Sequence, residues 1–168
     1  MAAADRILLD TGPLLTLLTL GYLRNVGAES ARCRSVLISV RPQYLPEDFE
    51  GRFRQLLGGS RLATSSHVLA EVFKLREHSR LKGDYYRFRK SALDELKKAN
   101  IEELHCHARD LSSEDSIDRL CQLGLTDATL VHIATERDYI VLSDDRRLRD
   151  SGSGYVRLLD TWLSREQS

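Results

Sequence analysis

A short apolar run that ends in a carboxylate is the feature that most constrains the fold of this chain. Residues 6–9 read Arg-Ile-Leu-Leu and are followed directly by Asp10. Short apolar runs of this kind are typical of parallel strands that are buried on both faces. A carboxylate beside such a run is costly unless something pairs with its charge. Because ligands of open α/β sheets bind at the carboxyl ends of the strands, Asp10 is a candidate functional residue.

Further apolar runs alternate with helical patterns along the chain. They predict strands at residues 61–65, 101–108, 139–143 and 155–159. Apolar residues at helical spacing predict helices between these strands. The first helix is expected after a turn at Gly12-Pro13, and Gly21 or Gly27 would end it. The alternation predicts an α/β fold, with a parallel sheet of about five strands and helices on both faces.

Several polar residues stand where helices should begin. Ser65 or Ser66 is expected to cap a helix that carries Glu71 at the border of its apolar stripe. Ser112 and Asp115 have the spacing of a capping box for a helix that stops at Gly124. Thr126 is a good N-cap, which would put Asp127 in the first turn of the next helix.

Length and composition restrict the functional classes. With 168 residues, the chain is expected to form one domain, 1–168, with an extended helical or loop region at about 25–59. Lys plus Arg (25) equals Asp plus Glu (25), so net charge does not indicate a nucleic-acid binder and any basic surface must be local. Asp10, Gly12 and Pro13 interrupt the leucine-rich stretch 7–23, which makes it a poor membrane span. Residues 1–6 lack the basic segment that opens a signal peptide, so none is expected.

Three scattered cysteines, Cys33, Cys106 and Cys121, show no CxxC spacing. They form neither a disulfide framework nor a zinc motif, which favours a reducing, cytoplasmic location. In His105-Cys106-His107, strand alternation would put both histidines on one face. Two ligands without partners do not make a zinc site, so we interpret this triplet as structural.

Carboxylates recur at the predicted functional end of the sheet. Besides Asp10 these are Glu71, Asp127, Asp144 and Asp145. Converging carboxylates would repel one another, and their pKa values would rise. Mg²⁺ or Mn²⁺ would remove that penalty, because hard cations take oxygen ligands together with waters and substrate phosphates. Such a site can activate water for in-line attack on a phosphodiester.

Each acid also has an ordinary interpretation. Asp127 could be a first-turn acid that the helix dipole favours, and Asp144 or Asp145 could cap a short helix over 146–150. Glu71 alone could be an edge residue of its helix. The joint arrangement at one end of the sheet is what favours a functional interpretation.

The chain resembles the PIN-domain nucleases in four ordered motifs. These are LLDTGPLL at 8–15, TSSHVLAEV at 64–72, LTDA at 125–128 and VLSDD at 141–145. The resemblance implies an α/β/α sandwich, dependence on Mg²⁺ or Mn²⁺, and cleavage of single-stranded RNA.

Within the resemblance, the family's metal-binding acids correspond to Asp10, Glu71 and Asp127. The last acid usually sits two residues after a Ser or Thr, which selects Asp145 after Ser143 and keeps Asp144 as the alternative. Thr11 and Ser143 match small hydroxyl residues that order the site in this family. We predict the same role for Ser65.

The motifs are compatible with two biological roles that are found within this family. Some PIN domains are toxins that an antitoxin protein covers, and others process RNA. The 25–59 region is longer than in compact toxins, which weakens the toxin assignment. A homodimer is a further candidate assembly, and a catalytically silent RNA- or protein-binding scaffold is the alternative from another functional class.

Two basic clusters are candidates for RNA contact. The first begins at Lys74 and continues to Lys90 with aromatic residues interleaved, although at this spacing such aromatics are more often core. The second holds Arg146, Arg147 and Arg149 beside the last acids. Arg146, Arg147 and Lys74 are the residues that we predict to contact RNA.

Two other classes share part of the first motif. Retroviral-type aspartic proteases carry the same Asp-Thr-Gly string, but on an all-β frame, which a mostly helical chain does not fit. Phosphatases with an aspartate nucleophile would need a second Asp two residues after Asp10, where this chain has Gly12.

Overall fold

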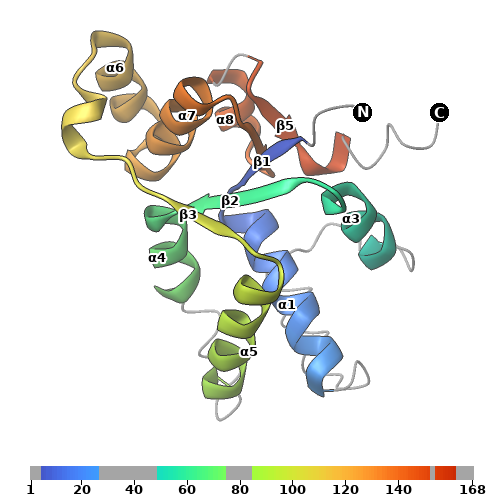
Figure 1. Cartoon of the computed structure of the whole chain (residues 1–168). Coiled ribbons are helices and arrows are strands. Elements are labelled where there is room, and N and C mark those ends of the chain that lie inside the picture. Colours follow the sequence, from blue (N-terminus) through green and yellow to red (C-terminus); the bar gives the residue numbers. More distant parts are fainter. Residues whose placement is uncertain (1–4, 27–48, 75–84, 152–153, 162–168) are drawn as a thin grey trace.

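The computed structural model describes residues 5–26, 49–74, 85–151 and 154–161 (Figure 1). Its centre is a five-stranded, all-parallel sheet in the order β3-β2-β1-β4-β5. The strands are β1 (Arg6–Leu9), β2 (Arg61–Ser65), β3 (Glu102–Leu104), β4 (Ile140–Ser143) and β5 (Val156–Leu158). The predicted α/β class and strand number are therefore confirmed.

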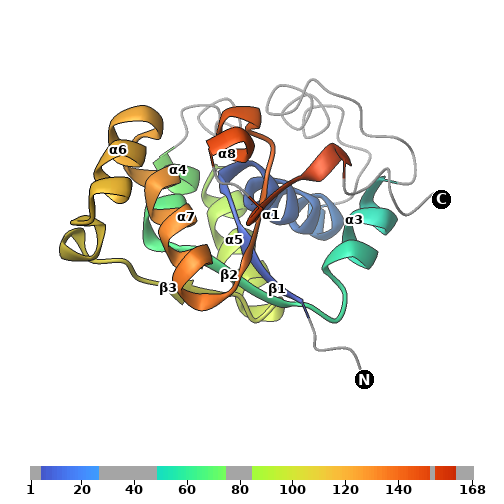
Figure 2. The same cartoon turned by 90° about the horizontal axis from the view of Figure 1, so that it is seen from above.

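Helices cover both faces of the sheet. The helices are α1 (Thr11–Val26), α3 (Phe49–Leu57), α4 (Ser66–Lys74), α5 (Tyr85–Lys98), α6 (Glu114–Leu123), α7 (Leu125–Arg137), α8 (Arg146–Ser151) and the 3₁₀ helix η2 (Ala108–Leu111). Figure 1 shows α1, α4 and α5 below the sheet and α6, α7 and α8 above it. Figure 2 looks down onto α6, α7 and α8, with α1 behind them. This is the expected α/β/α sandwich.

The strand order places a topological switch between β1 and β4. From β1 the chain moves outward through β2 to β3, and it then returns to the other side of β1 with β4 and β5. Right-handed crossovers put the helices of these two halves on opposite faces. The carboxyl ends of β1 and β4 are therefore the expected ligand position in such a sheet.

The third strand is shorter than predicted. It spans Glu102–Leu104 rather than 101–108, because it pairs only with the last residues of β2, Ala63 to Ser65. The chain then leaves the sheet, so His105 and His107 do not share a strand face.

Helix α1 starts differently from the prediction. It begins directly after Asp10, whose carbonyl accepts the Leu14 N–H at 3.0 Å, so Gly12 and Pro13 lie in its first turn. The predicted Gly12-Pro13 turn is therefore wrong. The helix continues through Gly21 and ends at Val26, directly before Gly27, which agrees with the second of its two predicted ends.

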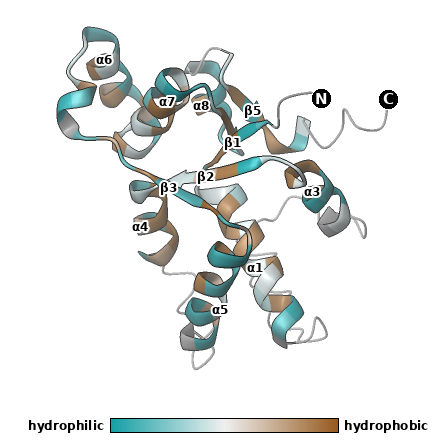
Figure 3. Cartoon of the chain, in the orientation of Figure 1, coloured by the Kyte–Doolittle hydropathy of each residue, from teal (hydrophilic) through white to brown (hydrophobic). Residues whose placement is uncertain are grey.

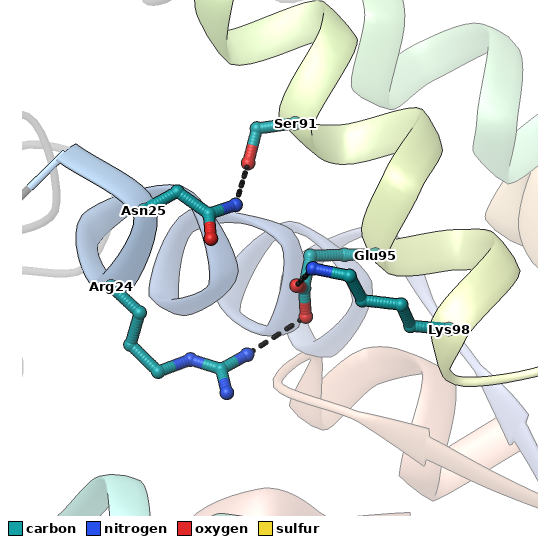
Figure 4. A network of polar contacts seen from close by, with 5 residues as sticks. All are labelled: Arg24, Asn25, Ser91, Glu95 and Lys98. Atoms are coloured by element: carbon teal, nitrogen blue, oxygen red, sulfur yellow. Dashed lines mark hydrogen bonds and ion pairs between the residues drawn. The ribbon is translucent and has the colours of Figure 1, made fainter.

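A polar network joins α1 to α5 (Figure 4). The Glu95 side chain is 5% exposed and accepts from Arg24 at 2.9 Å and from Lys98 at 3.3 Å. Asn25 donates to the Ser91 hydroxyl at 2.9 Å. The two helices are thus held together on the outer side of their layer.

The core lies between the sheet and its two helix layers. Ile7, Leu8 and Leu9 of β1 are fully buried, as expected for the central strand. In Figure 3 the helices α1 and α4 carry apolar stretches, whereas α5 is largely hydrophilic. Of the predicted 25–59 region, residues 27–48 lie outside the described residues, and α3 supplies the helix predicted near its end. No described helix has the length and apolar character needed to span a bilayer.

Candidate active site

Asp10 lies at the switch point of the sheet. Its N–H donates to the Leu142 carbonyl at 3.1 Å, so it extends the pairing of β1 with β4. The side chain is 8% exposed. One carboxylate oxygen accepts the Thr11 N–H at 2.6 Å, and the other accepts the Ser143 hydroxyl at 2.5 Å. The buried charge is therefore oriented by the first residue of α1 and the last residue of β4.

Ser143 relays this contact to α8. Its oxygen also accepts the Asp145 N–H at 2.9 Å, and Asp145 in turn accepts the Arg147 N–H at 2.7 Å. Asp145 therefore caps α8, which confirms that one acid of the pair has this local role. The second oxygen of Asp145 takes no part in that hydrogen bond.

Glu71 is held by two threonine hydroxyls from different helices. Thr11 of α1 donates to one carboxylate oxygen at 2.8 Å, and Thr126 of α7 donates to the other at 2.5 Å. Ser65 caps α4 by accepting the Val68 N–H at 3.2 Å, which resolves the predicted choice between Ser65 and Ser66. Glu71 thus joins α1, α4 and α7 at one rim of the sheet.

Two predicted caps are wrong. The residue before α7 is Gly124, at φ 91°, and Thr126 lies inside the first turn. Its hydroxyl bonds the Glu71 carboxylate instead, because a charged acceptor makes a stronger hydrogen bond than a neutral one. In α6, Ser113 rather than Ser112 accepts the Ser116 N–H. Asp127 is nevertheless in the first turn of α7, as predicted.

Burial and mutual repulsion raise the pKa values of two acids. The pKa of Asp10 is raised, chiefly by burial and further by Asp144 and Glu71, although its two hydrogen bonds act in the opposite direction. The pKa of Asp127 is raised to about 6 by burial and then by Asp10, Asp145 and Glu71. Arg147 lowers it. Each of the other three acids therefore lies close enough to Asp10 or Asp127 to raise its pKa.

The donor set fits a hard divalent cation. Every candidate ligand is a carboxylate, and Asp10 and Glu71 keep further lone pairs because each oxygen accepts one described hydrogen bond. Among the described residues, no three of these acids bring one oxygen each within 4.8 Å of one another.

The predicted RNA contacts lie at different distances from the acids. Arg147 lies close enough to lower the pKa of Asp127, and it also donates to the Gln122 carbonyl at 3.0 Å. Arg146 is exposed in the same turn of α8, whereas Lys74 is exposed at the end of α4 that points away from the rim. Phe88 is 1% exposed and belongs to the core, as its spacing predicted.

A comparison with protein-family models matches residues 34–152 to the PIN domain. This match covers well over half of the chain. The chain belongs to the PIN domain family. Members of this family are generally metal-dependent nucleases, which agrees with a rim of carboxylates. No curated protein matches the chain.

The PIN match and the structure complement each other. The matched segment includes Glu71, Asp127, Asp144 and Asp145, but it begins after Asp10. The position of Asp10 beside these acids therefore comes from the structure, through the pairing of β1 with β4. The hydroxyl of Thr126 was missed as a site contact by the sequence analysis, because its position also suits a helix cap.

Proposed function

We propose that this PIN domain is a divalent-metal-dependent endoribonuclease that hydrolyses phosphodiester bonds of single-stranded RNA. The observation that carries the proposal is the buried Asp10 carboxylate, with its raised pKa, at a rim shared with four further acids. Repulsion between buried carboxylates lowers the stability of the folded chain, and a bound cation would offset it.

Asp10, Glu71, Asp127 and Asp145 would hold Mg²⁺ or Mn²⁺, with Asp144 as the alternative to Asp145. When bound, the cation would polarise a water and offset negative charge on the phosphodiester. The rest of the chemistry falls to the protein. Hydroxyls of Thr11, Thr126 and Ser143 fix the carboxylates, and Ser65 fixes the start of the helix that carries Glu71.

Substrate phosphates would meet the arginines of α8. Arg147 lies beside Asp127 and Arg146 stands exposed next to it, so both can offset phosphate charge near the acids. Lys74, at the far end of α4, would contact a more distant part of the strand. Replacement of Arg146 should therefore weaken RNA binding more than replacement of Lys74.

The first experiment is a cleavage assay on mixed single-stranded RNA with Mg²⁺, Mn²⁺ or EDTA. Single-stranded DNA and duplex RNA of the same sequence test the substrate class. We expect metal-dependent cleavage that falls at least about 100-fold in Asp10→Asn and Asp127→Asn. Asp118→Asn is the matched control, because Asp118 is an exposed acid on α6.

The outcomes separate the candidate functions. Cleavage that persists in EDTA would contradict the metal-dependent mechanism. Absence of both cleavage and Mg²⁺ binding, measured by calorimetry, would favour the non-catalytic scaffold. Growth arrest on expression of the wild type, but not of Asp10→Asn, would support a toxin role with an antitoxin partner.

A further inference from the structure

Three side chains of types that can bind a metal meet where η2 packs against α7. They are Cys106, which follows β3, Asp110 in η2, and His132 in the middle of α7. One ligand atom from each, a thiol sulfur, a carboxylate oxygen and a ring nitrogen, all lie within 4.8 Å of one another. Cys106 and His132 are half-buried, and Asp110 is exposed.

Local hydrogen bonds explain why these residues converge. The His107 N–H donates to the Asp110 carboxylate at 2.9 Å, and the Asp110 N–H donates to the His107 carbonyl at 2.8 Å. These bonds fold the chain after β3 into a tight turn. Arg137 of α7 reaches the His105 carbonyl at 3.4 Å, which holds the turn against α7 and therefore beside His132.

The neighbouring histidines are not part of the cluster. The His105 ring nitrogen Nδ1 pairs with the Ser66 hydroxyl at 2.8 Å. The His105-Cys106-His107 triplet thus supplies its cysteine, while the nitrogen ligand comes from α7. Sequence spacing could not show this, because His132 lies 26 residues after Cys106 in the sequence.

The donors differ in kind from those at the acidic rim. Sulfur and imidazole nitrogen are ligands of zinc, whereas the rim offers only carboxylate oxygens. Zinc bonds of about 2.0–2.3 Å place tetrahedral ligand atoms about 3.5 Å apart, so small side-chain rotations would close this cluster around an ion. His132 is five residues beyond Asp127, about 7.5 Å along the helix axis.

Two further contacts at the cluster are weak. The Cys106 thiol donates to the His107 carbonyl at 3.7 Å. Arg109 approaches the Asp110 carboxylate at 3.8 Å, but its side chain is 83% exposed, where an ion pair contributes little. Burial, and to a lesser extent Asp110, raise the pKa of the Cys106 thiol, whereas Arg137 lowers it.

We propose that Cys106, Asp110 and His132 form a second metal site, selective for zinc-like ions, that ties η2 to α7. Three protein ligands leave a fourth position for water. The site would hold the helix that positions Asp127, and it does not depend on the proposed nuclease activity.

The test is titration of the full chain, kept reduced, with Co²⁺ as a spectroscopic probe and Zn²⁺ as competitor. We expect the near-ultraviolet band of a cobalt–thiolate bond, saturating at one equivalent and abolished by Zn²⁺. Cys106→Ser should remove the band, and His132→Gln should weaken Co²⁺ binding at least about 10-fold. Cys121→Ser is the matched control, because Cys121 is an exposed free cysteine on α6.

Two further variants make the result decisive. Asp110→Asn keeps a side-chain oxygen that can accept the His107 N–H of the turn, and it should also weaken Co²⁺ binding. Because Asp110 is exposed, this variant tests the site without a substitution at a half-buried position. Asp10→Asn should leave the thiolate band intact, which separates this site from the acidic rim. Absence of the band in the wild type, or its survival in Cys106→Ser, would overturn the proposal.

Discussion

Asp10 shows how a single buried charge is balanced at the residue scale. It accepts two short hydrogen bonds, from Thr11 and Ser143, and such bonds stabilise the ionised form. Its pKa is nevertheless raised, because burial outweighs them and the neighbouring acids add to the effect. The side chain is therefore oriented for a ligand but not neutralised by the protein.

Ser143→Ala should reduce both activity and stability. The substitution removes the hydroxyl that donates to Asp10 and leaves a buried carboxylate with one donor fewer. A hydrogen bond to a charged group contributes about 1.5–3 kcal/mol, so we expect a loss of that order in the free energy of unfolding. RNA cleavage should fall about 10- to 100-fold. Urea unfolding and the cleavage assay measure the two effects.

The matched control is Ser116→Ala. Ser116 is also a buried serine with a serine partner, but it lies on α6 away from the acids. It should lose stability and keep its specific activity. Equal losses of activity in both variants would contradict a special role for Ser143.

Asp127 should make the metal-free protein less stable as the pH rises. Its pKa is about 6 in the folded chain, against an ordinary value of 3.8. Between these values the folded chain keeps a proton that the unfolded chain has released, so the free energy of unfolding decreases with rising pH. Below pH 3.8 Asp127 is protonated in both states, so its repulsion costs no stability there. The loss of stability is complete above about pH 6.

Urea unfolding in EDTA from pH 4 to 8 checks this linkage. Asp127→Asn should show a weaker decline than the wild type and should be more stable than the wild type above about pH 6. Asp118→Asn, at an exposed acid, should keep the wild-type profile. If Asp127→Asn kept the pH dependence of the wild type, the carboxylate of Asp127 would not be under the predicted repulsion.

At the scale of elements, α1 and α5 meet at Gly21. A Cβ atom there would lie 2.1 Å from Cγ of Glu95 and 2.4 Å from its Cδ. Because Glu95 is buried and paired with Arg24 and Lys98, it cannot easily move away.

Gly21→Ala should therefore destabilise the protein. Alanine favours a helix over glycine by about 1 kcal/mol, but overpacking typically costs about 1–3 kcal/mol. Gly51→Ala is the control, since Gly51 lies in α3 with open space around its would-be Cβ. We expect a lower free energy of unfolding for Gly21→Ala and an equal or higher one for Gly51→Ala, both measured with urea. Stabilisation by Gly21→Ala would contradict the close approach of the helices.

Sequence patterns predicted elements well where a single local signal acted. The apolar runs at 6–9 and 61–65 became strands with those bounds. Prediction failed where a distant partner decided the outcome. The local sequence could not choose between Gly21 and Gly27 as the helix end, because it does not show the contact of Gly21 with Glu95. Thr126 looked like a cap because its partner, Glu71, lies 55 residues earlier.

At the scale of the whole molecule, the sheet explains why the acids could be foreseen. Each predicted acid follows a strand or stands near the start of a helix, and in a parallel sheet those positions share one rim. The lateral order of the strands could not be foreseen in the same way. It puts β4 rather than β3 beside β1, and it thereby brings Ser143 to Asp10 and Cys106 to His132.

The acidic rim should make the whole protein respond to Mg²⁺ or Mn²⁺. A cation that binds only the folded chain stabilises it by about 2.7 kcal/mol at 100 times its dissociation constant. For a chain of this size, each kcal/mol corresponds to about 2–4 °C in Tm. We therefore expect Mg²⁺ to raise the Tm by several degrees, measured by calorimetry against K⁺ at equal ionic strength.

Two variants test whether the rise in Tm comes from Mg²⁺ at the acidic rim. The alternatives are general screening of charge and binding at the cluster of Cys106, Asp110 and His132. Asp10→Asn should abolish most of the Mg²⁺-induced rise in Tm, because it removes the central carboxylate of the rim. Cys106→Ser should keep the rise, because a hard cation does not select a thiolate. An equal rise in Asp10→Asn would mean that Mg²⁺ binds elsewhere, and the acids would then be a repulsive cluster without a metal.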